Sequence, residues 1–307
     1  MPRLPHLALL ALLAPLASAA AQSSWRLERP IVAHRTGTFA DPRIGESSGV
    51  AASRRSPGVL WTHNDSGDPP YVFATDTSGA ALGAFSVTRA RNVDWEDIAL
   101  GPCAGATCLY LADTGDNNER RRSVALYRVP EPDLPAHYPL RVRPTAAAQA
   151  VIFGYPDGPH DVEAMWVAPN EDVHLVTKGR TGRVRHYRVP RAAWSLSRPV
   201  VAELLEPLPI FVRSELDRVT GAALSPDGRT VVVRTYSEAY FFFPTPNGRL
   251  GVPADPIACD VLALGIQGEG VSWLDDRSLV LTSERAILPA GTLAVVQCAL
   301  PQPVARR

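Results

Sequence analysis

Five short apolar runs along the chain each follow a polar turn of similar composition. The first apolar residues of these runs are Val50, Ile98, Met165, Ala222 and Val271. Their spacing ranges from 48 residues, between positions 50 and 98, to 67 residues, between positions 98 and 165. Periods of about 40 to 50 residues that are filled with short strand signals are typical of propeller blades. The pattern therefore predicts an all-β propeller.

Strand-like runs separated by turns rich in Gly, Pro, Asp and Ser fill each repeat. The first repeat has runs at 49–52, 59–63, 71–75 and 81–87, and the second at 98–100, 109–112, 124–129 and 150–153. The third has runs at 164–167, 173–177, 184–189 and 201–205, and the fourth at 222–224, 230–235 and 239–243 before a proline-rich return through 261. The Pro- and Ala-rich segment 130–146 is expected to be an irregular surface excursion.

The fifth repeat has only three runs, at 271–274, 278–282 and 292–298. The segment from Trp25 to Ala33 also resembles a strand, and Pro30 marks it as an edge strand because proline cannot donate to the ladder. We expect this segment to complete the fifth blade, since an open sheet edge would pair with other chains. Five blades closed by an N-terminal strand are favoured, and six blades are the alternative.

Residues 1–21 have the features of a signal peptide. Arg3 gives a basic start, Leu7 to Leu16 is a short apolar stretch, and small residues follow at 17–21. The stretch is shorter than the ~20 residues that span a bilayer. We expect residues 22–307 to form a single propeller domain that is periplasmic or secreted.

Four cysteines in an exported chain favour two disulfides, although four thiols allow three pairings. Cys103 and Cys108 bracket a tight turn between two strand-like runs, so a bond between them would staple a hairpin. Cys259 and Cys298 would then close the last third of the chain.

The charge balance narrows the range of partners. Lys plus Arg and Asp plus Glu both number 31, so the formal net charge is zero. No long-range field draws the chain to nucleic acid or to an anionic membrane. The expected partner is a small anionic molecule or an exported protein, and a monomer is expected.

Polar residues concentrate in two turns of each repeat: the turn before the first strand and the turn after the second. In an antiparallel sheet these two turns lie at the same end of the blade. Acidic and amide side chains from several blades would therefore converge on one rim of the channel. The residues predicted as metal ligands are Glu46, Asp94, Glu96, Asp97, Asp113, Asp116, Asn117, Glu163 and Glu269.

Converging carboxylates repel, so they must be protonated, paired with Lys or Arg, or neutralised by a cation. Oxygen-only ligands favour a hard ion, Ca²⁺ before Mg²⁺. Pairing with the basic residues of the same rim is the competing account. The residues predicted to bind a ligand there are His63, Asn64, Asp65, Lys178, Arg234 and Arg285.

Three motifs in the chain resemble a group of exported bacterial β-propellers, broadly phytase-like or SdiA-regulated-like. They are the stretches 63–67 (His-Asn-Asp-Ser-Gly), 94–99 (Asp-Trp-Glu-Asp-Ile-Ala) and 112–117 (Ala-Asp-Thr-Gly-Asp-Asn). The resemblance implies a propeller with a Ca²⁺ site and, more weakly, a phosphoesterase.

Two functions compete on these grounds. One is a metal-dependent hydrolase of a phosphoester or lactone, in which the metal polarises the substrate and a rim carboxylate activates water. The other is a non-catalytic propeller that holds a ligand or a protein on the same rim. The sequence has no Gly-x-Ser-x-Gly motif and no Gly-rich phosphate loop, so it identifies no catalytic residue.

Overall fold

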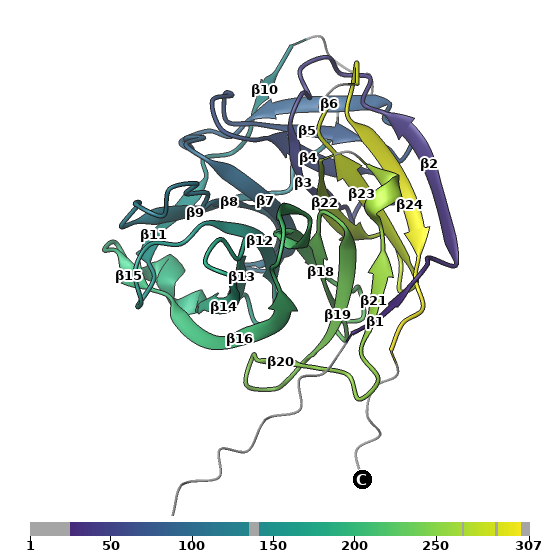
Figure 1. The fold of residues 1–307 in the computed structure, drawn as a ribbon. Coiled ribbons are helices and arrows are strands. Elements are labelled where there is room, and N and C mark those ends of the chain that lie inside the picture. Colours follow the sequence, from purple (N-terminus) through teal and green to yellow (C-terminus); the bar gives the residue numbers. More distant parts are fainter. Residues whose placement is uncertain (1–24, 135–140, 266, 286–287, 302–307) are drawn as a thin grey trace, which may run out of the picture.

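Five antiparallel sheets surround a central axis, as the ribbon of the computed structural model shows (Figure 1). The structure describes residues 25–134, 141–265, 267–285 and 288–301, so the predicted signal peptide lies outside the described residues. Within those ranges the chain forms strands and three short 3₁₀ helices, η1 (Arg191–Ser195), η2 (Glu215–Asp217) and η3 (Leu262–Leu264), and no α-helix. None of the described helices has the length and hydropathy needed to cross a membrane.

Each sheet is one blade of four antiparallel strands. Blade one contains β3 (Ser47–Ala52), β4 (Leu60–Asn64), β5 (Tyr71–Thr75) and β6 (Ala81–Ser86). Blade two contains β7 (Trp95–Cys103), β8 (Ala106–Asp113), β9 (Val124–Pro130) and β11 (Gln149–Gly154). Blade three contains β12 (Val162–Val167), β13 (Val173–Thr177), β14 (Arg183–Val189) and β16 (Glu203–Phe211). The prediction of a five-bladed propeller is confirmed for the described residues.

Blade four contains β17 (Val219–Leu224), β18 (Val231–Thr235), β19 (Glu238–Pro244) and β21 (Ile257–Asp260). Blade five contains β22 (Gly268–Trp273), β23 (Ser278–Ser283), β24 (Thr292–Gln297) and β2 (Val32–Thr38). The short strands β1 (Arg26–Glu28), β10 (Arg143–Pro144) and β15 (Val200–Val201) add to outer edges in parallel, and β20 (Leu250–Gly251) pairs with β19. The segment 130–146 is thus not wholly irregular, because β10 extends blade one.

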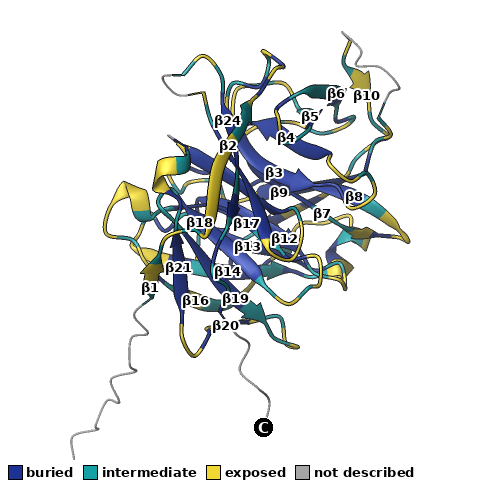
Figure 2. Ribbon diagram, turned by 90° about the vertical axis from the view of Figure 1, so that its right-hand side faces the viewer, coloured by how far each residue is buried: buried dark blue, intermediate teal, exposed yellow. Residues whose placement is uncertain are grey.

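The innermost strands β3, β7, β12, β17 and β22 form a ring in which each contacts its two neighbours. Their residues are buried, and Figure 2 shows β3, β7 and β12 mostly in dark blue. Glycine residues allow neighbouring inner strands to approach one another most closely. A Cβ at Gly49 would lie 2.8 Å from the backbone nitrogen of Ile98, and one at Gly270 would lie 2.7 Å from the nitrogen of Val50. Apolar side chains fill the space between adjacent blades and exclude water from it.

The N-terminal strand closes the ring, but the closing segment differs from the predicted one. β2 pairs antiparallel with β24, so the purple and yellow strands lie side by side in Figure 1. The predicted strand from Trp25 to Ala33 is instead divided around Pro30. Its first half, β1, pairs with β21 of blade four, and Trp25 donates its indole N–H to the carbonyl oxygen of Pro209 in blade three, 2.8 Å away. The missing N–H of Pro30 accounts for the break between the two strands.

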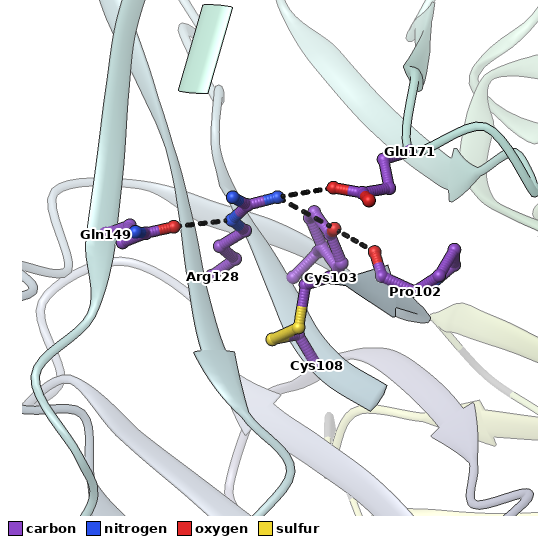
Figure 3. Close-up of a disulfide and its surroundings, with 7 residues drawn as sticks. Pro102, Cys103, Cys108, Arg128, Gln149 and Glu171 are labelled. Atoms are coloured by element: carbon purple, nitrogen blue, oxygen red, sulfur yellow. Dashed lines mark hydrogen bonds and ion pairs between the residues drawn. A yellow bond between two sulfur atoms is a disulfide. The ribbon is translucent and has the colours of Figure 1, made fainter. Parts of the chain in front are cut away.

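Both expected disulfides are present. Cys103–Cys108 staples the β7–β8 hairpin, beside Arg128, which reaches Gln149 at 2.7 Å and Glu171 at 3.1 Å (Figure 3). Cys259–Cys298 joins β21 to the residue after β24 and so ties blade four to blade five. In the chain-entropy model a loop of this length stabilises the fold by about 4 kcal/mol. Disulfides agree with a protein that matures outside the cytoplasm.

Removing N-terminal residues tests whether β2 closes the propeller. A chain that begins at Phe39 lacks β2 and exposes the edge of β24, so it should aggregate or lose its cooperative unfolding transition. A chain that begins at Ile31 keeps β2 and loses only β1 and Trp25, so it should unfold cooperatively at a lower midpoint. Thermal melts of both, beside a chain that begins at Gln22, test this. A chain from Phe39 that is as stable as the longest one would refute closure by β2.

Candidate functional site at the acidic end of the channel

Each innermost strand carries one extra residue near its start. The strand register shifts between Ser47 and Gly49, between Trp95 and Asp97, and at the same place in the other three blades. The unpaired residues at these β-bulges are Ser48, Glu96, Glu163, Thr220 and Glu269, the last together with Gly270. A bulge changes the direction of the side chain it carries and is frequent beside functional sites. Here five bulges lie at the same end of the channel.

The two hydroxyl residues among the five hold neighbouring blades together. Ser48 Oγ donates to the carbonyl oxygen of Glu96 at 2.8 Å, and Thr220 Oγ1 donates to that of Glu269 at 3.0 Å. The other three bulge residues are glutamates, whose carboxyl groups can bind a cation or exchange a proton. All three are buried.

The turns after the second strands add further charged groups at this end. In every blade the first residue of the inner strand pairs with the last residue of the next strand, as Ser47 does with Asn64 and Val162 with Thr177. Asp65, Lys178 and Glu284 directly follow such residues. The register therefore brings the two predicted sets of turns to one rim.

Four carboxylates gather around that of Glu96. Its oxygens lie within 4.8 Å of oxygens of Asp65 and Asp94 on one side, and within 4.8 Å of oxygens of Asp161 and Glu163 on the other. Glu96, Asp161 and Glu163 are buried, whereas Asp65 and Asp94 are partly accessible. The cluster thus has a buried half and a half open to solvent.

Two of these acids have basic partners. Lys178 Nζ lies 2.6 Å from Glu163 Oε1, and the guanidinium of Arg180 donates to Asp161. Burial tends to lower the pKa of Lys178, but attraction to Glu163 outweighs it, so the pKa is raised and the ammonium stays charged. Asp65, Asp94 and Glu96 form no ion pair within 4 Å among the described residues. The basic residues therefore neutralise only one half of the cluster.

Burial and mutual repulsion make these acids weak. Burial, with added repulsion from Asp65 and Asp161, raises the pKa of Asp94 to about 6. Burial raises the pKa of Glu163 to about 7 against the opposing effect of Lys178. The pKa of Glu96 is raised well above its ordinary value, first by burial and then by Glu163. Glu96 and Glu163 are hydrogen-bonded, so one proton can be shared between them.

Glu269, the third bulge glutamate, interacts electrostatically with both Glu163 and Lys178. Burial and repulsion from Glu163 raise its pKa well above the ordinary value. Its carboxyl group accepts a hydrogen bond from Tyr236. Arg234 is fully buried and donates to the carbonyl oxygens of Gly270 and Thr282 at 2.7 and 2.8 Å. Arg234 is therefore held in the interior by backbone carbonyl oxygens and is not exposed on the rim.

Asp97, also predicted as a metal ligand, is placed differently from its neighbour Glu96. One carboxylate oxygen accepts from the backbone nitrogen of Met165 at 2.7 Å and from that of Ala222 at 3.3 Å. The other accepts from the nitrogen of Ile98 at 2.8 Å. Asp97 thus joins the inner strands of blades two, three and four, and its oxygens are occupied by backbone donors.

Three further predicted ligands lie beside the cluster in blade two. Asp113 accepts from Arg121 at 2.8 Å and from the nitrogen of Asp94 at 3.2 Å. Asp116 accepts from the nitrogen of Arg121, and Asn117 accepts from Arg180. These residues hold the turn that positions Asp94 and Asp161.

The predicted ligand-binding residues are divided between the interior and the rim. His63 is fully buried and donates to the carbonyl oxygen of Asn64 at 2.9 Å, and burial lowers its pKa to about 4. The Asn64 amide oxygen accepts from the nitrogens of Gly45 and Glu46, both at 3.2 Å. His63 is thus held in the interior, whereas Asn64 lines the polar cavity of blade one.

Glu46 and Arg285 line a polar cavity of about 680 Å³ between blades one and five. The guanidinium of Arg285 has no hydrogen-bond partner among the described residues, and its charge acts on Glu46. Burial and repulsion from Asp65 raise the pKa of Glu46. This cavity adjoins the accessible half of the cluster through Ser66 and Asp68.

Two acidic residues of the rim, Asp161 and Glu284, are absent from the predicted ligand set. Asp161 has the place in blade three that Asp94 has in blade two, two residues before the bulge glutamate. Aligning the repeats on their first apolar residues also aligns the five bulge residues. The same alignment places Asp161 opposite Asp94, so Asp161 could have been identified from the sequence.

No family model matches the chain, and no curated protein matches it. Among solved structures, the chain is similar to the PQQ-bound form of an aldose sugar dehydrogenase from Streptomyces coelicolor. The two share 10% sequence identity at a TM-score of 0.47, over 88% of this chain and 99% of the other. A likeness at this level does not bear on activity.

The raised carboxyl pKa values predict how stability depends on pH without divalent ions. Burial raises the pKa of Glu284 to about 7, whereas an unfolded glutamate titrates near ~4.3. The folded state therefore holds a proton that the unfolded state has lost, so stability should fall as pH rises from about 4 to about 7.

The Glu284→Gln variant has no carboxyl group to titrate at this position, so its stability should fall less than that of wild type as the pH rises. In EDTA, the variant should gain on the order of 1 kcal/mol relative to wild type between pH 4.5 and pH 8, a value reduced by solvent screening at this partly accessible group. Urea midpoints across that range measure the effect, with the exposed Glu215→Gln as the matched control. Parallel pH profiles for wild type and Glu284→Gln would contradict the assignment.

Proposed function

We propose that the chain is an exported propeller that binds a divalent cation, Ca²⁺ before Mg²⁺, at the acidic end of its channel. The observation that carries this proposal is the sharing of Glu96 between two groups of carboxylates whose oxygens all lie within 4.8 Å of one another. The donors are all oxygen, which suits a hard ion. The three motifs that resemble exported phytase-like and SdiA-regulated-like propellers imply the same Ca²⁺ site and are part of the basis of this proposal.

Asp65, Asp94 and Glu96 would hold the ion. They form the half of the cluster that has no ion pair, and two of the three are accessible to solvent. A cation there would offset the repulsion that raises the pKa of Asp94 and of Glu96. Asp161 and Glu163 complete the acidic surroundings but already have Arg180 and Lys178 as partners.

The proposed reaction is hydrolysis of a small anionic phosphoester or lactone. When bound, the ion supplies Lewis-acid polarisation of a substrate oxygen. Arg285, which lines the adjoining cavity of about 680 Å³, would attract the negative charge of the substrate. A rim carboxylate that does not ligate the ion would accept a proton from the attacking water. We expect the protein to act as a monomer in the periplasm or outside the cell.

A second candidate function is a non-catalytic propeller that holds a ligand or a protein partner on the same rim. The observation that favours it is the pairing of Lys178 with Glu163 and of Arg180 with Asp161. These pairs neutralise part of the cluster without any ion. In that case the rim is a fixed charged surface, and turnover is not required.

Thermal melts with Ca²⁺ and with EDTA test the cation site. At 100 times the dissociation constant, Ca²⁺ should stabilise wild type by about 2.7 kcal/mol through linkage, and EDTA should remove that gain. Glu96→Gln should lose the response, because Glu96 belongs to both carboxylate groups. Asp227→Asn, at the opposite end of the channel, is the control and should respond as wild type does. An unchanged wild-type midpoint would exclude the cation and leave the ion pairs as the account of the rim.

Turnover is tested separately, with a panel of phosphoesters and lactones assayed in Ca²⁺ and in EDTA. Hydrolysis that needs Ca²⁺ and is lost in Glu96→Gln, which removes a proposed ligand of the ion, would support the enzyme. Calcium binding without turnover of any member of the panel would favour the second candidate.

A further inference from the structure

A row of hydrogen-bonded polar side chains crosses the face of blade three that packs against blade four. His174 Nδ1 lies 2.8 Å from His186 Nε2, and His186 Nδ1 lies 2.8 Å from Glu206 Oε1. The three residues come from the adjacent strands β13, β14 and β16. Trp166 stacks on the ring of His174, with 4.9 Å between centroids and 5° between planes. Neither histidine belongs to a group that could hold a metal among the described residues.

The row fixes which nitrogen of each ring carries the proton. Glu206 Oε1 is an acceptor, and it also receives the backbone N–H of Leu250 at 2.9 Å. His186 must therefore donate through Nδ1, which leaves its Nε2 to accept from His174 Nδ1. In neutral His174 the remaining nitrogen, Nε2, is then a hydrogen-bond acceptor. Burial lowers the pKa of both histidines and so favours this neutral state.

Nε2 of His174 has no hydrogen-bond partner among the described residues, and the ring lines a cavity of about 230 Å³ between blades three and four. The charged groups beside it are occupied with one another. Arg188 donates to Glu203 at 3.0 Å and lies 3.7 Å from Asp172, while Arg249 lies 3.4 Å from Glu206. Neutral His174 therefore presents an oriented acceptor to the cavity, and neighbouring carboxylates balance the charges of Arg188 and Arg249.

This small cavity adjoins a larger one at the end of the channel opposite the acids. The larger cavity measures about 510 Å³ and is lined largely by apolar residues of the inner strands, among them Val50, Ile98 and Ala222. Trp166, Pro169, Leu224 and Gly228 line both cavities. An apolar pocket with a few placed polar groups is the usual form of a small-molecule site.

We propose that the two adjoining cavities form a second binding site, for a small, uncharged and mainly apolar molecule whose hydroxyl or N–H group donates to Nε2 of His174. An anion is disfavoured because neutral His174 offers it no donor and Arg188 is paired with Glu203 and Asp172. A metal is disfavoured because, among the described residues, His174 belongs to no group of side chains that could hold one. The apolar walls favour a compact ring system, and the acceptor fixes its orientation.

Two aromatic probes that differ in one donor test the inference. 2-Naphthol has a hydroxyl group, and 2-methoxynaphthalene has the same ring system without a donor. In EDTA, which separates this test from the proposed cation site, 2-naphthol should bind ~3- to 10-fold more tightly, as one net hydrogen bond predicts. Equal affinities, or tighter binding of the methoxy compound, measured by calorimetry or probe fluorescence, would overturn the proposal.

A matched pair of variants locates the effect. His174→Phe keeps a ring of similar size and removes the acceptor, so the preference for 2-naphthol should disappear. His34→Phe makes the same change at an exposed histidine of β2 and should leave the preference intact. A preference that survives in His174→Phe would contradict the site.

A measurement on wild type makes the test independent of whether the variant folds. With ¹⁵N-labelled histidine, 2-naphthol should shift the resonance of an unprotonated Nε2 nitrogen, and 2-methoxynaphthalene should not. The same shift with both probes, or with neither, would overturn the role of His174.

Discussion

The crowding of five inner strands around one axis is the constraint on which the rest of the structure depends. The strands approach so closely that Gly49 and Gly270 leave no room for a Cβ, and Asp97 binds the backbone of three blades at once. Each strand has one extra residue at the same end, and these bulges aim Glu96, Glu163 and Glu269 together. Closure by β2 and by the Cys259–Cys298 disulfide keeps the ring, and therefore the acids, in place.

Burial of several carboxyl groups in one place is costly, since the effective penalty is several kcal/mol for each unpaired ion. The structure offsets it in two ways. Lys178 and Arg180 neutralise Glu163 and Asp161, and raised pKa values let other acids keep a proton. Asp65 and Asp94 lie at the open edge of the cluster without a basic partner. A bound divalent cation would provide the compensation that this half lacks, and this is the physical basis of the proposed cation site.

Much of the fold can be predicted from the sequence because alternating strands and turn residues are local signals. The blades, both disulfides and N-terminal closure follow from such signals. The bulges do not, because strand register depends on pairing between segments distant in sequence. Within blade two alone, Glu96 and Asp97 are therefore indistinguishable as sequence, although one faces the channel end and the other binds backbone nitrogens. Only the alignment of all five repeats, which places Glu96 with Glu163 and Glu269, separates them. The same reason hides the row of His174, His186 and Glu206, which only strand pairing brings together.

The central claim is that the acidic end of the channel binds a divalent cation, and the most direct measurement is anomalous X-ray scattering from crystals grown with Mn²⁺ as a substitute for Ca²⁺. The account predicts one strong anomalous peak among the carboxylates of Asp65, Asp94 and Glu96, and loss of that peak from crystals of Glu96→Gln. A map with no peak at this end of the channel, while Lys178 remains paired with Glu163, would contradict it.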